Sequence, residues 1–145
     1  EILKCGTYAP SGKSKQSAII VVIQNRDTIE KIAKINGSFV NKPGLNPFYE
    51  APTLLVVFAD KNIATYVQDG SAVIMNMLNA AYSLGVDSCW IHRAKETFTT
   101  EEGKKLMQKW GLNDDYEGIG NIVLGYRDCP LPQAAPRKEN YIIYD

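Results

Sequence analysis

Apolar residues gather in blocks that predict four strands. Residues 19–23 and 53–59 are almost continuously apolar and rich in β-branched side chains, which is the pattern of strands buried on both faces. Residues 86–92 and 118–126 are two further apolar runs, and glycines flank the second one. Near the end of the chain, the apolar residues 141–144 are a candidate for an edge or exchanged strand.

Helical patterns lie between these strands. The sequence predicts helices at residues 1–8, 25–35, 64–84 and 99–110, and a loop at 38–50. Because strands and helices alternate along the chain, we expect a layered domain that mixes the two.

Capping signals support two of these helices. Asp27 or Thr28 is placed to accept a hydrogen bond from the first turn of the second helix. Thr99 and Glu102 have the spacing of a capping box, in which each side chain bonds the other residue's backbone N–H. We therefore expect the last helix to begin at Thr99.

The helix at residues 64–84 has an unusual surface. Apolar side chains cover nearly its whole circumference, and only Asp69, Asn76, Asn79 and Ser83 interrupt them. A helix with this pattern is buried in a large core or against a second subunit. In a chain of 145 residues, a subunit interface is the better explanation.

Composition excludes several classes of function. The chain has 16 Lys+Arg and 16 Asp+Glu, so its formal net charge is zero, whereas nucleic-acid binders usually carry a basic excess. One histidine and three widely spaced cysteines provide neither a zinc-type ligand set nor a disulfide framework. No apolar run reaches the length of a membrane span. We expect no metal, nucleic acid or membrane partner, and a cytoplasmic location.

A polar stretch at residues 8–16 precedes the first strand and resembles part of a phosphate-binding loop. Gly12-Lys13-Ser14 matches the end of the P-loop pattern, but Thr7 stands where the first glycine belongs. A P-loop also leads from a strand into a helix, whose N-terminus holds the phosphate. The order here is helix, loop, strand, so nucleotide binding through Lys13 remains a weaker alternative.

The sequence shows no obvious acid–base pair. Cys89 and His92 are three residues apart on a predicted strand, so their side chains would point to opposite faces, and we expect Cys89 to be a small buried residue. Cationic residues instead gather in loops beside strand ends. Together they suit a cofactor whose phosphate they bind and whose ring lies against backbone; they are Lys13, Lys15, Arg93, Arg137 and Lys138.

Five motifs in order resemble the FMN-dependent nitroreductase family, and together they extend over essentially the whole chain. They are Ala9-Pro10-Ser11-Gly12-Lys13-Ser14-Lys15-Gln16, Ala51-Pro52-Thr53, Leu84-Gly85-Val86-Asp87-Ser88-Cys89-Trp90-Ile91, Leu124-Gly125-Tyr126 and Pro136-Arg137-Lys138.

The resemblance implies a fold, a cofactor and a reaction. The fold would be α+β, with a mixed, mainly antiparallel central sheet flanked by helices, in an intertwined homodimer that binds two FMN molecules at its interface. NAD(P)H would reduce FMN, which would then reduce a nitroaromatic, quinone or similar flat acceptor in a ping-pong cycle. The flavin would carry the hydride, so no catalytic side chain is expected. A flavin-binding or redox-sensing protein of the same fold, without turnover, is the alternative.

The resemblance also assigns cofactor-binding residues. The flavin ring would lie against Pro10, Ser11 and Gly12 and against the backbone of residues 89–91. Arg137 and Lys138 in the tail would bind the phosphate. The full set is Pro10, Ser11, Gly12, Ser14, Gln16, Cys89, Trp90, Ile91, Arg137 and Lys138.

The chain departs from the family pattern in three places. An Arg-rich motif that usually precedes this region is absent, and the chain starts at Glu1 within a helical pattern. We therefore expect residues 1–145 to be a single FMN-binding domain that lacks its N-terminal segment. Ser14 replaces a common Asn, and Asp87 replaces a frequent glycine; we expect these changes to tune the site.

Overall fold

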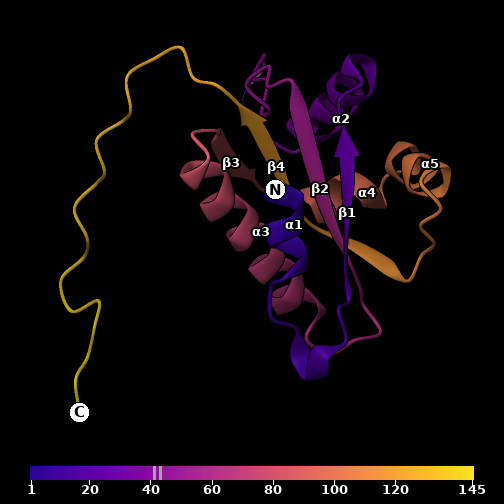
Figure 1. Cartoon of the computed structure of the whole chain (residues 1–145). Helices are drawn as coiled ribbons and strands as arrows, with labels where there is room; N and C mark the ends of the chain where they lie inside the picture. The colour runs from indigo at the N-terminus through magenta and orange to yellow at the C-terminus, as the bar shows by residue number, and fades with distance from the viewer. Residues whose placement is uncertain (41, 43) are drawn as a thin grey trace.

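A four-stranded antiparallel sheet forms the centre of the molecule, with strand order β1-β2-β4-β3 (Figure 1). The computed structural model describes residues 1–40, 42 and 44–145. The strands are β1 (Ala18–Ile23), β2 (Thr53–Asp60), β3 (Asp87–Ile91) and β4 (Tyr116–Gly125).

Helices cover both faces of this sheet. On one face, α3 packs against the sheet and α1 packs against α3; α2, α4 and α5 cover the other face (Figure 1). The helices are α1 (Ile2–Thr7), a short 3-10 turn η1 (Gly12–Ser14), α2 (Arg26–Ser38), α3 (Tyr66–Ser83), α4 (Ala94–Thr99) and α5 (Glu101–Lys109). The predicted α+β class with helices flanking a sheet is confirmed.

The central strand β2 confirms the prediction of burial on both faces. Leu54, Val56 and Phe58 point to the α2 side of the sheet, where Phe58 meets the ring of Phe98 at 4.8 Å between centroids. Leu55 and its neighbours on the other face pack under α3. Burial of this apolar surface is the main driving force for assembling the three layers.

The same prediction is wrong for β1. This strand pairs only with β2 and forms an edge of the sheet. Four of its residues are half-buried, and Val22 is 47% exposed. A run of apolar residues therefore identified the strand but not its place in the sheet.

Two helix starts also differ from the sequence prediction. Asn25, rather than Asp27 or Thr28, caps α2 by accepting a hydrogen bond from the Thr28 N–H at 2.9 Å. Thr100, rather than Thr99, caps α5 by accepting from the Gly103 N–H at 3.0 Å. The residues just before it form α4, a short helix that the sequence analysis did not predict.

The chain beyond β4 is extended and exposed, and it runs away from the rest of the molecule (Figure 1). The apolar residues 141–144 form no strand in the single chain. In the predicted loop at 38–50, α2 continues through Ser38, and Phe48 is fully buried; Asn41 and Pro43 lie outside the described residues. None of the described helices is long and apolar enough to cross a membrane.

Candidate functional site

The loop between α1 and β1 is tightly constructed. A side chain at Gly12 would place its Cβ 2.2 Å from the Thr65 hydroxyl oxygen, so only glycine fits at this contact. Lys13, Ser14 and Gln16 adopt left-handed φ angles of 51°, 55° and 49°. Non-glycine residues hold such conformations only where their surroundings impose them. The Ser11 hydroxyl supplies one such constraint, since its oxygen accepts a hydrogen bond from the Gln16 N–H at 3.0 Å.

Asp69, in helix α3, supplies the main constraint on this loop. It lies in the first turn of α3 and is only 4% exposed. One carboxylate oxygen accepts from the Gly12 N–H at 2.9 Å, and the other from the Ser17 hydroxyl at 2.7 Å and the Thr65 hydroxyl at 3.2 Å. The middle and the end of the loop are thereby tied to the start of one helix. Sequence analysis noted Asp69 only as a polar break in an apolar helix, which was the available signal for a buried, bonded acid.

The hydrogen bonds also set the charge state of Asp69. Burial on its own would raise the pKa of this carboxyl, but the hydrogen bonds from Gly12, Ser17 and Thr65 outweigh it and hold the pKa below its usual value. Asp69 is therefore ionised at neutral pH, and both its oxygens act as hydrogen-bond acceptors.

The loop geometry excludes the P-loop alternative. Lys13 lies within η1, and the chain then enters β1 rather than an α-helix. No helix N-terminus follows this lysine to bind a phosphate. The sequence order of helix, loop and strand predicted this outcome.

The second predicted group lies on β3, the edge strand opposite β1. Trp90 is exposed along part of its ring, and its indole lies over Gly120, where a Cβ would come within 2.3 Å of the indole nitrogen. Ile91 is buried in the core. Cys89 is exposed rather than buried, although partial burial still raises the pKa of its thiol. An edge strand presents unpaired backbone groups to a ligand or partner.

Buried polar side chains fix the end of β3. The Asn36 amide donates to the His92 carbonyl oxygen at 2.9 Å, and the Asn121 amide donates to the Ile91 carbonyl oxygen at 3.3 Å. The Thr97 hydroxyl donates to the Arg93 carbonyl oxygen at 2.7 Å. Sequence analysis missed this network; Asn121, an amide within an apolar run, was the available signal.

The third predicted group lies on the exposed tail. The Arg137 guanidinium donates to the Ala135 carbonyl oxygen, and the Lys138 ammonium lies 5.2 Å from the centre of the Tyr141 ring. Within the described part of the chain, neither cation forms an ion pair with a carboxylate. Both charges are therefore available to an anion.

The fold of the single chain does not bring the three groups together. Pro10, Ser11 and Gln16 line a cavity of about 380 Å³ with Asp69, and no described residue of β3 or the tail lines it. Gly12 and Ser14 belong to the same loop. The edge strands β1 and β3 are separated by two central strands, or about 14 Å across the sheet at the usual strand spacing.

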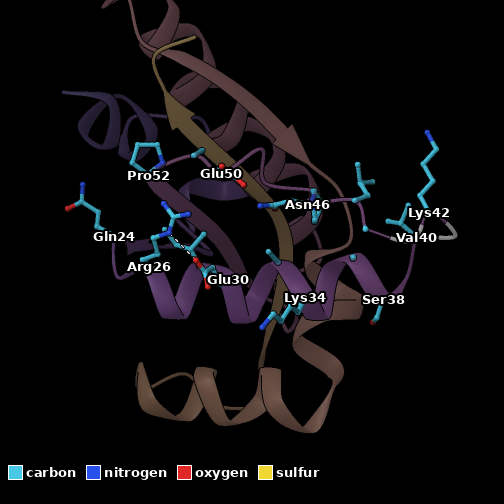
Figure 2. A pocket seen from close by; sticks show the side chains of 17 residues that line it. Gln24, Arg26, Glu30, Lys34, Ser38, Val40, Lys42, Asn46, Glu50 and Pro52 are labelled. Atoms are coloured by element: carbon cyan, nitrogen blue, oxygen red, sulfur yellow. Dashed lines mark hydrogen bonds and ion pairs between the residues drawn. The ribbon is translucent and has the colours of Figure 1, made fainter. Parts of the chain in front are cut away.

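A larger cavity, of about 740 Å³, lies elsewhere, between α2 and the following loop. Figure 2 shows Arg26 extending from the start of α2 toward the loop that carries Glu50 and Pro52, with Glu30 beside it. Arg26 and Glu30 form an ion pair with each other at 2.9 Å. None of the predicted cofactor-binding residues lines this cavity, so it is separate from the candidate site. The described residues also contain no cluster of three or more potential metal ligands.

Comparison with known proteins identifies the family. The profile of the nitroreductase family matches residues 42–126, more than half of the chain. The chain therefore belongs to the nitroreductase family.

Similar proteins agree with this assignment. A crystal structure of a nitroreductase with bound FMN from Bacteroides fragilis superposes with a TM-score of 0.86 at 26% identity, over 99% of this chain and 84% of that one. An Archaeoglobus fulgidus protein named "Putative NADH dehydrogenase/NAD(P)H nitroreductase" is 28% identical over 132 residues, or 87% of this chain and 70% of the relative. A Methanothermobacter thermautotrophicus protein of the same name is 29% identical over 96 residues, and the match covers 62% of this chain and 46% of that relative.

Asp69→Asn should destabilise the protein in a pH-dependent way. The variant loses the charge that three donors share, so we expect its free energy of unfolding at pH 7 to fall by about 1–3 kcal/mol, the cost of a poorly satisfied buried hydrogen bond. Because the folded pKa of Asp69 is lowered, its contribution is present above the unfolded carboxyl pKa, about 3.9, and is lost as pH falls through the folded value. Urea unfolding at fixed protein concentration should show the difference shrinking below about pH 4.

Asp114→Asn is the matched control for this measurement, because Asp114 is exposed and surface substitutions of this kind change stability by about 0.5 kcal/mol or less. Equal stability of wild type and Asp69→Asn at pH 7 would contradict the role of Asp69 in holding the loop.

Proposed function

We propose that the protein is an FMN-dependent oxidoreductase that uses NAD(P)H to reduce nitroaromatic, quinone or similar flat acceptors. The observation that carries the proposal is the similarity of 99% of the chain to a nitroreductase whose crystal structure contains FMN. Residues 1–145 would act as a single FMN-binding domain. The described cysteines are free, which suits the reducing cytoplasm that we propose as its location.

The residues of the three groups fit the parts of FMN. Pro10, Ser11 and Gly12 form a small, rigid surface against which a flat ring can lie. The edge backbone around Cys89, Trp90 and Ile91 offers N–H donors to the ring's polar edge. Arg137 and Lys138, which form no ion pair in the described part of the chain, match the charge of a phosphate.

The chemistry divides between cofactor and protein. When bound, FMN would supply the redox chemistry between NAD(P)H and the acceptor. The loop held by Asp69 would position the ring, with Ser14 and Gln16 providing polar contacts beside it. The backbone of β3 would donate hydrogen bonds where negative charge develops on the ring. No side chain is required as a general acid or base in this scheme.

We further propose that the active form is a homodimer with exchanged tails. The proposal is supported by the separation of the three groups and by apolar side chains left exposed on α3 and the tail. Tyr82 on α3 is 78% exposed and Ile143 in the tail is 88% exposed. A second copy would cover these side chains while completing each site, as apolar surface at a protein–protein interface is covered.

Flavin content and turnover test the proposed function together. The purified protein, or the protein after incubation with FMN, should show flavin absorbance and should oxidise NADH or NADPH when a quinone or nitroaromatic is supplied. A protein that cannot be loaded with FMN would contradict the proposal. Bound flavin without NAD(P)H oxidation would instead support the flavin-binding alternative.

Arg137→Ala should weaken FMN binding without affecting riboflavin, which lacks the phosphate. Loss of one charge-assisted contact with phosphate, worth about 1.5–3 kcal/mol, predicts a rise in the FMN dissociation constant of about ten- to a hundredfold. Flavin fluorescence titrations measure both constants. Lys105→Ala, at an exposed position on α5, is the control. An unchanged FMN constant for Arg137→Ala would refute the phosphate assignment.

Removal of residues 140–145 should dissociate the dimer. The deletion takes away the exposed apolar group that includes Tyr141 and Ile143, which we expect to pack on the partner. Sedimentation measurements across a range of protein concentrations should show a dimer for the full chain and a shift to monomer for the truncated one. A truncated protein that dimerises as strongly as the full chain would exclude tail exchange as the source of stability.

A further inference from the structure

The chain leaves the sheet at a contact between Asp87 and Arg127. Asp87 is the first residue of β3 and pairs across the sheet with Gly125, the last residue of β4. One Asp87 carboxylate oxygen accepts a hydrogen bond from the Arg127 backbone N–H at 3.0 Å. The other oxygen accepts from the Arg127 guanidinium. The Asp87 carboxylate therefore binds both the backbone and the side chain of Arg127, at the start of the tail.

Beyond this contact, the tail has no hydrogen bond or ion pair to the rest of the molecule among the described residues. Arg137 bonds to Ala135, and Lys138 stacks on Tyr141, so these interactions remain within the tail. The contact of Asp87 with Arg127 is thus the last point at which the body of the protein fixes the path of the tail.

The tail is semi-rigid, so the angle at which it leaves β4 affects the position of its far end. Pro130, Pro132 and Pro136 lie between Arg127 and the predicted phosphate-binding residues. Proline restricts its own φ angle and favours extended backbone in the residue before it. Proline-rich segments therefore behave as semi-rigid spacers rather than as random coil. A change in the angle at which the tail leaves β4 would displace its far end.

We propose that Asp87 is a positioning residue for the phosphate of FMN. It orients the tail through Arg127 and so places Arg137 and Lys138, while its own strand carries the backbone that faces the ring. One carboxylate thereby links the strand that carries ring-binding backbone to the tail that carries the phosphate-binding cations. This inference rests on the proposed function, and it does not depend on which protomer's site each tail completes.

Comparison of FMN with riboflavin isolates this role. In Asp87→Ala, the dissociation constant for FMN should rise about three- to tenfold, which corresponds to the contribution of a partly exposed charge pair with an added hydrogen bond. The constant for riboflavin should not change, because riboflavin has no phosphate. A general loss of structure would weaken both ligands equally, so the ratio of the two constants separates positioning from stability.

Further variants test the contact itself. Arg127→Ala keeps the backbone N–H that donates to Asp87, so its effect on FMN should be smaller than that of Asp87→Ala. The double variant should bind FMN no more weakly than Asp87→Ala alone, because the two residues act through one contact. Glu30→Gln is the matched control, since it breaks an exposed ion pair with Arg26 on α2, away from the tail.

Each outcome bears on the inference. If Asp87→Ala folds and its ratio of FMN to riboflavin constants equals that of wild type, the positioning role is wrong. If Asp87→Ala fails to fold, Arg127→Ala decides the question by the same ratio. If the wild-type protein itself binds no FMN, or binds FMN and riboflavin equally, the proposed function or its phosphate assignment fails, and the role of Asp87 falls with it.

Discussion

The ionised carboxylate of Asp69 is the interaction on which the candidate site depends. A buried charge is costly unless hydrogen bonds replace the water that it loses, and three donors perform this task here. Two of these donors come from the loop, so the hydrogen bonds that stabilise the charge also hold the loop in its conformation. The neighbouring Gly70 lets α3 approach the sheet closely, since a Cβ there would lie 2.6 Å from the side chain of Ile119. The packing of one helix therefore determines where the loop lies.

The sheet determines what this loop can reach. Its two edge strands have different neighbours: β1 follows the loop, and β3 carries the Cys89–Ile91 backbone. Antiparallel pairing through β2 and β4 keeps these edges apart within the single chain. The homodimer proposed above would bring the two edges to one site, and it would also cover the apolar side chains that α3 leaves exposed.

Much of the architecture could be predicted from the sequence, because long apolar runs and helical periodicity report burial directly. Strand β2 and helix α3 are examples, whereas the family was suggested by motifs that resemble those of known proteins. The place of β1 at an edge was not predictable, since strand order depends on pairing between distant segments. Helix α4 was missed because six residues carry too little periodicity, and Asn25 was overlooked as a cap beside two plausible neighbours. The role of Asp69 depends on partners 57 and 52 residues away, which no local pattern contains.

The tail shows why some predicted residues stay untested by the fold of one chain. Arg137 and Lys138 were named from a motif, yet the described structure gives them no partner outside the tail. The structure of a single chain shows only contacts between residues of that chain. The partner of a phosphate-binding cation belongs to the ligand, so its contact is not among them. If FMN contacts segments from two protomers, its binding free energy is also free energy of association. The cofactor would then be a structural element of the dimer, and loss of FMN would weaken the assembly as well as remove the redox chemistry.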